Sequence, residues 1–331
     1  MKARALLTGL SLAAGAGVCV AALWAGPGEQ PWTALQEASW PLLALALAVA
    51  VAEPLLRAVR LRVFTRALDG RLSLWTSARI TLVGDFAAAI TPSRLGGEPA
   101  RLCALIRAGL SSGAAGAVLL GEFLTDLCAL IFLVIVALGL SGSGAGPQAV
   151  WPSVALLAGG GAAIGLALRW PSILDRLWTP LSSRRPTAWA LRKAGLEGFS
   201  PGRWAAEVRG RSGVLLAGRW RGTAVGGICA LLHTTARFAV LPLLTAAFAV
   251  PLDLRSAILI QMAIFYGLAL VPTPGGSGVP EIAFAAALSL SAPSAPVGLL
   301  LILWRFLTFY LGGAAGGVVS PGLFYAEGRR A

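Results

Sequence analysis

The chain has 331 residues, of which 57% are hydrophobic and 12% charged, and its mean hydropathy is +0.78. This composition is far more apolar than that of a soluble domain and indicates an integral membrane protein. A formal net charge of +13 is also typical of nucleic-acid binding, but here the basic residues lie between apolar segments long enough to span a bilayer. Membrane topology therefore explains the charge, and no nucleic-acid partner is expected.

Catalytic and metal-binding motifs are missing from the sequence. Its four cysteines, Cys19, Cys103, Cys128 and Cys229, form no CxxC pair and lie in apolar segments, which argues against a zinc site and a disulfide framework. The sequence has no GxxxxGK[ST], HExxH or GxSxG motif and no soluble segment large enough for a catalytic domain. We therefore expect no enzyme activity, no metal and no cofactor.

Apolar segments that can cross a bilayer recur along the chain, each close to the roughly 20 residues that a spanning helix needs. They are residues 5–24, 39–56, 113–140, 149–168, 222–249 and 297–319. The first segment resembles a signal peptide, but it is long and lacks a clear A-x-A site, so we expect an uncleaved helix. Residues 1–331 should form one integral membrane domain with about six full spans.

The distribution of arginine predicts the orientation, because short cytoplasmic loops collect Lys and Arg. The connection 57–71 carries five arginines, and the connection 169–221 is the most basic stretch of the chain. Arg329 and Arg330 directly precede the last residue. Residues 141–148 and 292–296 carry no charge. Both termini are therefore expected on the cytoplasmic side of a bacterial cytoplasmic membrane.

Two further apolar regions, 73–110 and 255–291, are interrupted by proline and glycine clusters. If the arginine-rich connections share one side, the first region must enter and leave on the cytoplasmic side and the second on the external side. They are therefore predicted to be re-entrant hairpins of opposite orientation, an inverted repeat typical of transporters. Alternatively, the clusters only kink two buried helices. The expected fold class is an all-α polytopic membrane protein.

The first interruption reads TPSRLGGEPAR, residues 91–101. Its proline and Gly96-Gly97 should stop one helix, and Glu98 should begin the next, where a carboxylate is favoured by the helix dipole. Arg101 lies three residues further on and can pair with Glu98. The charges in this stretch thus have a local explanation, apart from the arginine at its tip.

The second interruption, PTPGGSGVPE at 272–281, repeats the pattern. Helix N-termini are ready anion sites, and Arg94, at the tip of the first interruption, has no local structural explanation. The two tips together are therefore predicted to bind an anionic headgroup such as a phosphate. The predicted binding residues are Arg94, Gly96, Gly97, Glu98, Arg101, Thr273, Gly275, Gly276 and Glu281.

Charged residues also occur inside the predicted spans. Glu122 and Asp126 are four apart on one helical face, His233 and Arg237 are four apart on another, and Arg305 lies in the last span. Intramembrane ionisable residues usually face the bundle interior, pair, and mark a pathway. We predict a charge network that either contacts the substrate or only braces helices, for instance through Glu122 or Asp126 with Arg237 or Arg305.

Other polar residues are given structural roles. Glu53, Arg79 and Asp85 are expected to support structure or to snorkel towards the membrane surface. His233, the only histidine, is expected to be an interhelical hydrogen bonder rather than a proton shuttle. Residues 170–221 are expected to form a basic cytoplasmic or interfacial loop whose tryptophans lie at headgroup level.

Four sequence features together resemble the transmembrane region of lysylphosphatidylglycerol synthases. They are TPSRLGGEPAR at 91–101, the acidic pair Glu122 and Asp126, PTPGGSGVPE at 272–281, and WRFLTFY at 304–310. The resemblance implies the flippase module of the multiple peptide resistance factor, which moves a phospholipid across the bilayer with two inverted re-entrant hairpins.

The resemblance extends over roughly residues 40–320 and also implies residue roles. It places Arg94, Glu98, Arg101, Glu122, Asp126, Glu281 and Arg305 on motif positions of the family. Synthase members continue into a cytosolic aminoacyl-transferase domain that this sequence lacks, so lysyl-lipid synthesis is not implied. Some relatives are linked to polyprenyl-phosphate sugar pathways, which leaves the lipid open.

The expected function is a lipid transporter or flippase that moves a phospholipid or a polyprenyl-phosphate-type lipid. The expected partner is a membrane lipid with an anionic headgroup, together with a possible second copy of the chain or a separate synthase. Two alternatives remain: a membrane-embedded transferase acting on a lipid-phosphate carrier, which would need an acidic metal-binding cluster, and a non-transporting scaffold that recruits a partner through the basic loop.

Overall fold

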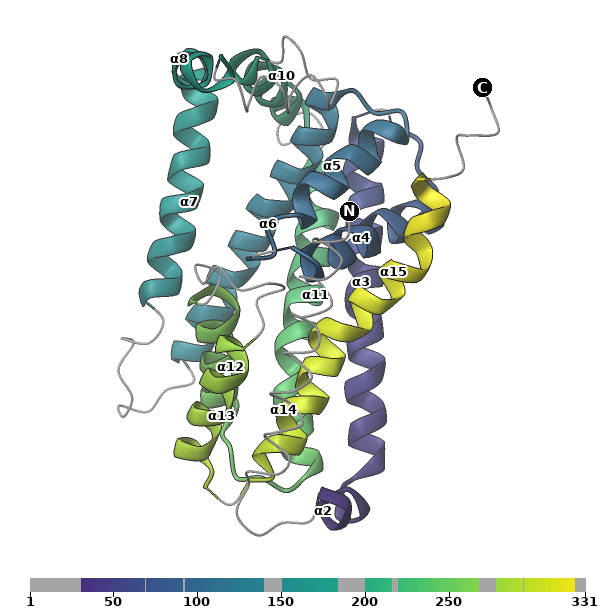
Figure 1. Ribbon diagram of the computed structural model, residues 1–331, viewed down its shortest axis with the longest axis vertical. Coiled ribbons are helices and arrows are strands. Elements are labelled where there is room, and N and C mark those ends of the chain that lie inside the picture. The colour runs from purple at the N-terminus through teal and green to yellow at the C-terminus, as the bar shows by residue number, and fades with distance from the viewer. Residues whose placement is uncertain are drawn as a thin grey trace.

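The protein is described from a computed structural model, which covers residues 31–68, 70–91, 93–139, 151–183, 200–215, 220–267, 278–293 and 295–324. All regular secondary structure in these ranges is helical (Figure 1). In chain order the helices are α2 Pro31–Glu37, α3 Trp40–Ala67, α4 Leu74–Ala89, α5 Gly97–Arg107, α6 Ser112–Gly139, α7 Trp151–Arg169, α8 Pro171–Ser182, α10 Pro201–Gly213, α11 Trp220–Ala247, α12 Leu254–Met262, the π-helix η3 Ala263–Gly267, α13 Val279–Ser291, α14 Val297–Arg305, the π-helix η5 Phe306–Tyr310 and α15 Leu311–Phe324.

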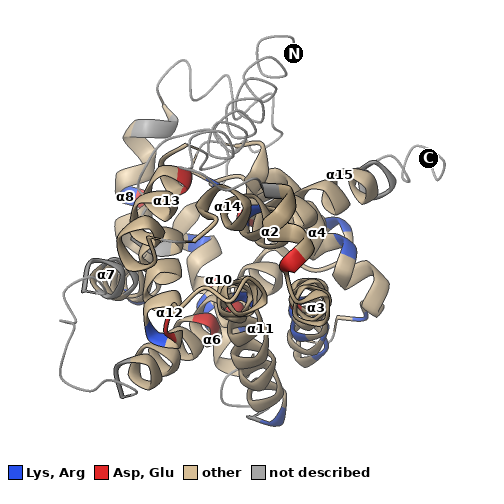
Figure 2. Ribbon diagram, turned by 90° about the horizontal axis from the view of Figure 1, so that it is seen from below, with Lys and Arg blue, Asp and Glu red and all other residues tan. Residues whose placement is uncertain are grey.

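Four stretches of the described chain are long and apolar enough to cross a membrane. They are Trp40–Ala67, Ser112–Ala137, Arg221–Ala247 and Val297–Ser320. Seen along the bundle, the described ribbon is mostly free of acidic and basic residues (Figure 2). The all-helical membrane protein is confirmed. The predicted span at 149–168 is helical as α7, and the one at 5–24 lies outside the described residues, so the total number of spans stays a prediction.

The predicted end of the second span at residue 56 is wrong. The helix α3 continues without a break to Ala67, so Arg57 and Arg60 belong to the helix and not to a cytoplasmic connection. Both side chains meet carboxylates of neighbouring helices. These ion pairs offset the cost of removing the arginines from water, so the helix can continue through them.

α4 and α5 form the first helical pair, as the break at 91–101 predicted. α4 ends at Ala89 and α5 begins at Gly97, and the two helices pack against each other. A Cβ on Gly84 would lie 2.5 Å from the Arg101 side chain, and one on Gly97 would lie 3.1 Å from the Gly84 carbonyl oxygen. Glycine is therefore required for this close approach.

α15 also packs closely on α4, through glycines at four-residue spacing. A Cβ on Gly316 would overlap the carbonyl oxygen of Leu82, and one on Gly312 would lie 3.2 Å from the Asp85 carboxylate. Small residues at this spacing allow helix backbones to approach in membrane proteins. α15 thus packs closely against α4 along the side of the helix that includes Asp85.

The second helical pair consists of α12 with η3, followed by α13. Asp253 precedes α12 and accepts a hydrogen bond from the Ser256 backbone N–H at 3.0 Å. Hydrogen bonds from Ser256 hold the pKa of Asp253 below its ordinary value. Gly278 precedes α13 with φ +97°, a left-handed conformation that favours glycine, and its N–H donates to Glu281 Oε2 at 2.6 Å.

The two helical pairs lie towards opposite ends of the bundle. α4 and α5 lie in the upper half of Figure 1, the half that also contains α8 and α10, whereas α12 and α13 lie in the lower half. The link between η3 and α13 falls on residues 268–277, outside the described residues. Helical pairs at both predicted places agree with two hairpins, but whether either is re-entrant in a membrane stays a prediction.

The basic region 170–221 contains two short helices, α8 and α10. Asp175 of α8 accepts hydrogen bonds from the Ser200 hydroxyl and the Gly202 backbone N–H, both at 2.9 Å, and so caps α10. Trp204 of α10 donates its indole N–H to the Ser112 carbonyl oxygen at 3.2 Å. α8 lies across the end of α7 (Figure 1), the direction expected of an interfacial helix.

Two apolar cores flank a polar layer. One core contains Leu61 and Phe64 of α3, and the other contains Ala46 and Ala50 of the same helix. The residues of α3 that lie between these cores include Glu53, Arg57 and Arg60. The charged residues are therefore held deep in the bundle, with apolar packing above and below them.

Candidate functional site

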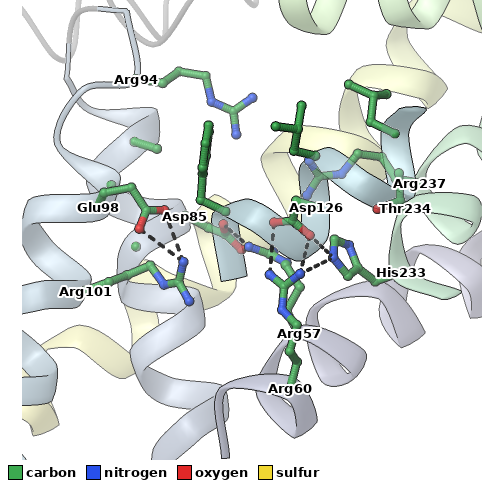
Figure 3. A pocket seen from close by; sticks show the side chains of 16 residues that line it. Arg57, Arg60, Asp85, Arg94, Glu98, Arg101, Asp126, His233, Thr234 and Arg237 are labelled. Carbon is green, nitrogen blue, oxygen red and sulfur yellow. Dashed lines mark hydrogen bonds and ion pairs between the residues drawn. The ribbon is translucent and has the colours of Figure 1, made fainter. Parts of the chain in front are cut away.

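Charged side chains from five helices meet between the two apolar cores (Figure 3). We call this group the charged layer. It consists of Glu53, Arg57 and Arg60 of α3, Asp85 of α4, Arg101 of α5, Glu122 and Asp126 of α6, and His233 and Arg237 of α11. The sequence predicted a network at this depth, but with a different set of pairs.

Glu122 binds two arginines from different helices. It is 2% exposed, and its Oε1 accepts from Arg60 Nε at 3.2 Å while its Oε2 pairs with Arg101. Arg60 also forms two bonds to Asp126, one of them from Nη2 to Oδ2 at 3.0 Å. These contacts join α3, α5 and α6. Each buried charge has an opposite charge beside it, which offsets the cost of burying charges between the three helices.

Arg57 joins α3 to α4. It donates to both carboxylate oxygens of Asp85, at 2.9 and 2.6 Å, and to Glu53 at 3.1 Å. Glu53 pairs in addition with Arg237 of α11. Asp85 and Glu53 therefore support the structure, as predicted, by forming ion pairs between helices. Both also belong to the charge network, a membership that the sequence analysis did not predict.

His233 lies against three charged groups. Its Nε2 is 2.8 Å from Asp126 Oδ1 and 3.1 Å from Arg60 Nη1, and its Nδ1 is 3.8 Å from Glu53 Oε1. These contacts agree with the predicted role of an interhelical hydrogen bonder. The pairings suggested for the acidic residues of α6 with Arg237 or Arg305 are wrong, because Arg60 of α3 and Arg101 of α5 occupy those carboxylates.

A cavity of about 290 Å³ opens within the charged layer. Its wall carries five arginines and three carboxylates, a net excess of two positive charges with His233 neutral; these residues are Arg57, Arg60, Arg94, Arg101, Arg237, Asp85, Glu98 and Asp126. Glu53 and Glu122 do not line this cavity but bind arginines that do, and with these two carboxylates the net charge of the group is zero. The surface that faces into the cavity is therefore cationic although the group is balanced.

Arg94 lies in the turn between α4 and α5 and points into this cavity (Figure 3). Its guanidinium lies over the Phe309 ring, 5.1 Å from the centroid, and it pairs with no carboxylate within the described part of the chain. Arg94 and Ser93 both have positive φ, +60° and +50°. A positive φ is strained for a residue other than glycine, and backbone strain of this kind is concentrated at functional sites.

The other predicted residues of this turn have different positions. Gly97, Glu98 and Arg101 line the cavity, whereas Gly96 does not. The Gly96 N–H donates to Thr91 Oγ1 at 2.8 Å, so it is already occupied and unavailable to an anion. Arg101 is committed to Glu98 and Glu122, which makes it a structural member of the wall.

The second tip contributes a separate ion pair. Arg305 donates from Nε to Glu281 Oε1 at 2.8 Å, and both residues are buried. The Arg305 guanidinium lies 5.2 Å from the centroid of the same Phe309 ring that contacts Arg94. Phe309 therefore connects the first tip to the second helical pair. Thr273, Gly275 and Gly276 lie outside the described residues.

Two arginines of the cavity wall, Arg57 and Arg60, were missed by the sequence analysis. They were assigned to a loop because charges near a predicted span end normally belong to one. A signal was present: Glu53, Arg57 and Arg60 have the i, i+4, i+7 spacing of one helical face. That spacing predicts a charged stripe on a continuous helix.

Comparison with known proteins agrees with the helical membrane architecture. The family model described as "Lysylphosphatidylglycerol synthase TM region" matches residues 7–316. A "UPF0104 membrane protein" of Archaeoglobus fulgidus is 28% identical over 297 residues, which cover 85% of this chain and 86% of that protein. The match spans both helical pairs and the charged layer. The chain therefore belongs to the lysylphosphatidylglycerol synthase TM region family.

Proposed function

We propose that this protein binds the anionic headgroup of a membrane lipid in the charged cavity and moves that lipid across the cytoplasmic membrane. The observation that carries the proposal is Arg94, a guanidinium directed into a cationic cavity inside an apolar bundle without a carboxylate partner among the described residues. A charged side chain held inside an apolar membrane bundle without a partner is costly. A bound anion would offset part of that cost.

A phosphate group suits the chemistry of this cavity. Guanidinium groups bind phosphate oxygens with paired, charge-assisted hydrogen bonds, and such bonds are stronger where water is excluded. The other arginines of the wall are already paired with carboxylates, whereas the donors of Arg94 have no carboxylate partner among the described residues. This assigns recognition to Arg94 and positioning to Arg57, Arg60 and Arg101.

The arrangement of the helical pairs supports transport rather than simple binding. Paired broken helices in opposite halves of a membrane protein are typical of transporters that expose a central site to each side in turn. The end of the bundle with α8 and α10 is also the end at which α3 finishes (Figure 1), and arginines occur in the last turn of α3 and in both α8 and α10. We infer that this end faces the cytoplasm.

Reconstitution into proteoliposomes tests the proposal. Fluorescently labelled phosphatidylglycerol is reconstituted with the full chain, and dithionite quenching reports how fast the label changes leaflet. Arg94→Gln should abolish the protein-dependent rate and Arg94→Lys should retain part of it. Arg71→Gln is the matched control, because Arg71 is exposed and lies outside the cavity. Equal rates for wild type and Arg94→Gln would refute the assigned role.

The two alternatives have no specific support from the described residues. The transferase alternative requires an acidic metal-binding cluster, and no group of three His, Cys, Asp or Glu in the described ranges is arranged to hold a metal ion. The carboxylates of the charged layer are engaged by arginines. The scaffold alternative, the lack of an enzyme activity and a homo-oligomeric or synthase partner stay predictions.

A further inference from the structure

A second cavity of about 230 Å³ adjoins the charged one. The two cavities share four lining residues, Arg57, Asp85, Arg94 and Arg237. Most of the remaining wall is apolar and comes from α3, α4, η5 and α15; it includes Val51, Leu55, Leu82, Leu307, Leu311 and Ala315. The polar cavity therefore passes directly into an apolar one at these four residues, which include Arg94, the arginine without a carboxylate partner among the described residues.

The apolar cavity reaches the outer surface of the bundle. On its α3 side, Val51 and Leu55 are 44% and 51% exposed. Its opposite side is formed where the last membrane-spanning stretch changes to the π-helix η5, and π segments inside α-helices occur frequently at functional sites. An apolar path thus runs from the lipid-facing surface, between α3 and η5–α15, to Arg94.

We propose that this second cavity holds the first part of a hydrocarbon chain of the lipid whose phosphate lies at Arg94, and that the lipid enters sideways between α3 and η5–α15. This inference rests on the proposed function. In a phospholipid the phosphate joins the polar headgroup to the chains, and Arg94 occupies the corresponding junction between the polar and apolar cavities. The order of chemical groups along the lipid therefore matches the order of the cavities.

The apolar cavity should contribute position more than affinity. Lipid tails are about as apolar as leucine side chains, so moving a chain from the bilayer into this cavity has little hydrophobic driving force. Affinity then comes from the headgroup. The apolar cavity lets the lipid headgroup reach the charged layer while the hydrocarbon chain of the same lipid remains in contact with apolar side chains.

Photolabelling tests the position of the chain. The full-length protein is placed in nanodiscs that contain phosphatidylglycerol with a diazirine near the carboxyl end of one acyl chain, within the part of the chain that the cavity is proposed to hold. Labelled peptides are mapped by mass spectrometry after illumination. In the wild type, label is expected on α3 around Val51 and Leu55 and on η5–α15 around Leu307 and Leu311. Label confined to other lipid-facing surfaces, such as Ile131 and Phe132 of α6, would overturn the inference.

A matched pair of variants makes the test specific. Ala315 lines the cavity, whereas the adjacent Ala314 is exposed and does not. Ala315→Phe should reduce labelling of the cavity at least about fivefold, because it fills the space that the chain needs, and Ala314→Phe should leave labelling unchanged. If Ala315→Phe does not fold, Ala315→Leu is used as the cavity-filling variant instead. Equal labelling in the Ala315 and Ala314 variants would contradict the inference.

Arg94→Gln separates the two levels of the proposal. If it abolishes transport while cavity labelling in wild type is absent, the headgroup site stands and the chain site fails. If Arg94→Gln retains both transport and cavity labelling, the headgroup site fails, and the proposed link between the two cavities at Arg94 fails with it, although the apolar cavity still takes up a lipid chain. Loss of transport together with loss of cavity labelling supports both.

Discussion

Replacing Glu122 with glutamine tests whether the charged layer braces the bundle. Glu122 is 2% exposed and binds Arg60 and Arg101 with one oxygen each. Glutamine keeps the shape but offers one acceptor oxygen, so one buried guanidinium would face an amide N–H₂ group. Removing one partner of a buried ion pair costs about 3–5 kcal/mol. Because Asp126 and Glu98 still bind the two arginines, we expect the low end, about 3 kcal/mol.

The measurement is equilibrium unfolding in detergent micelles by titration with sodium dodecyl sulfate, followed by tryptophan fluorescence. Glu98→Gln is the control, since Glu98 also pairs with Arg101 but its side chain is 66% exposed. An exposed pair contributes about 0–1 kcal/mol, so this variant should unfold close to wild type. If Glu122→Gln is as stable as Glu98→Gln, the buried charges do not brace the helices and the structural role given to Arg101 is wrong.

Three further predictions concern the packing that holds the site. Gly316→Ala should lower the yield of folded protein in size-exclusion chromatography, because its Cβ overlaps the Leu82 carbonyl oxygen, whereas Gly227→Ala, with open space around it, should not. Gln261→Leu should cost about 1–3 kcal/mol in the same unfolding titration, because the buried indole N–H of Trp304 loses its acceptor; with Trp304→Phe the two costs should not add. Asp253 has a lowered pKa, so its capping stabilises α12 above the ordinary aspartate pKa and is lost as the pH falls through the lowered value. The protection of the first turn of α12 against amide hydrogen exchange, taken relative to the intrinsic exchange rate at each pH, should therefore fall at acidic pH in wild type but not in Asp253→Ala.

The sequence was sufficient to predict the membrane class and the two broken helical regions. Proline and glycine act locally, so the end of α4 at Ala89 and the start of α5 at Gly97 follow from residues within a few positions. The same locality explains the predicted pairing of Glu98 with Arg101, which the structure contains.

The pairings of the charged layer could not be predicted in the same way. Arg60 binds Glu122 and Asp126, which are 62 and 66 residues away in the chain, and only the packing of α3 on α6 brings them together. Similarly, nothing near Phe309 in the sequence indicates that its ring contacts both Arg94 and Arg305. Single-sequence patterns specify which residues are buried, but partners across helices depend on tertiary structure.

The most direct test of the central claim is an experimental structure of the full chain in nanodiscs that contain phosphatidylglycerol. We predict phosphate density within hydrogen-bond distance of the Arg94 guanidinium, with chain density continuing between α3 and η5–α15. A structure in which lipids are ordered on the outer surface of the bundle, while the charged cavity holds only water and Arg94 points away from it, would contradict the account.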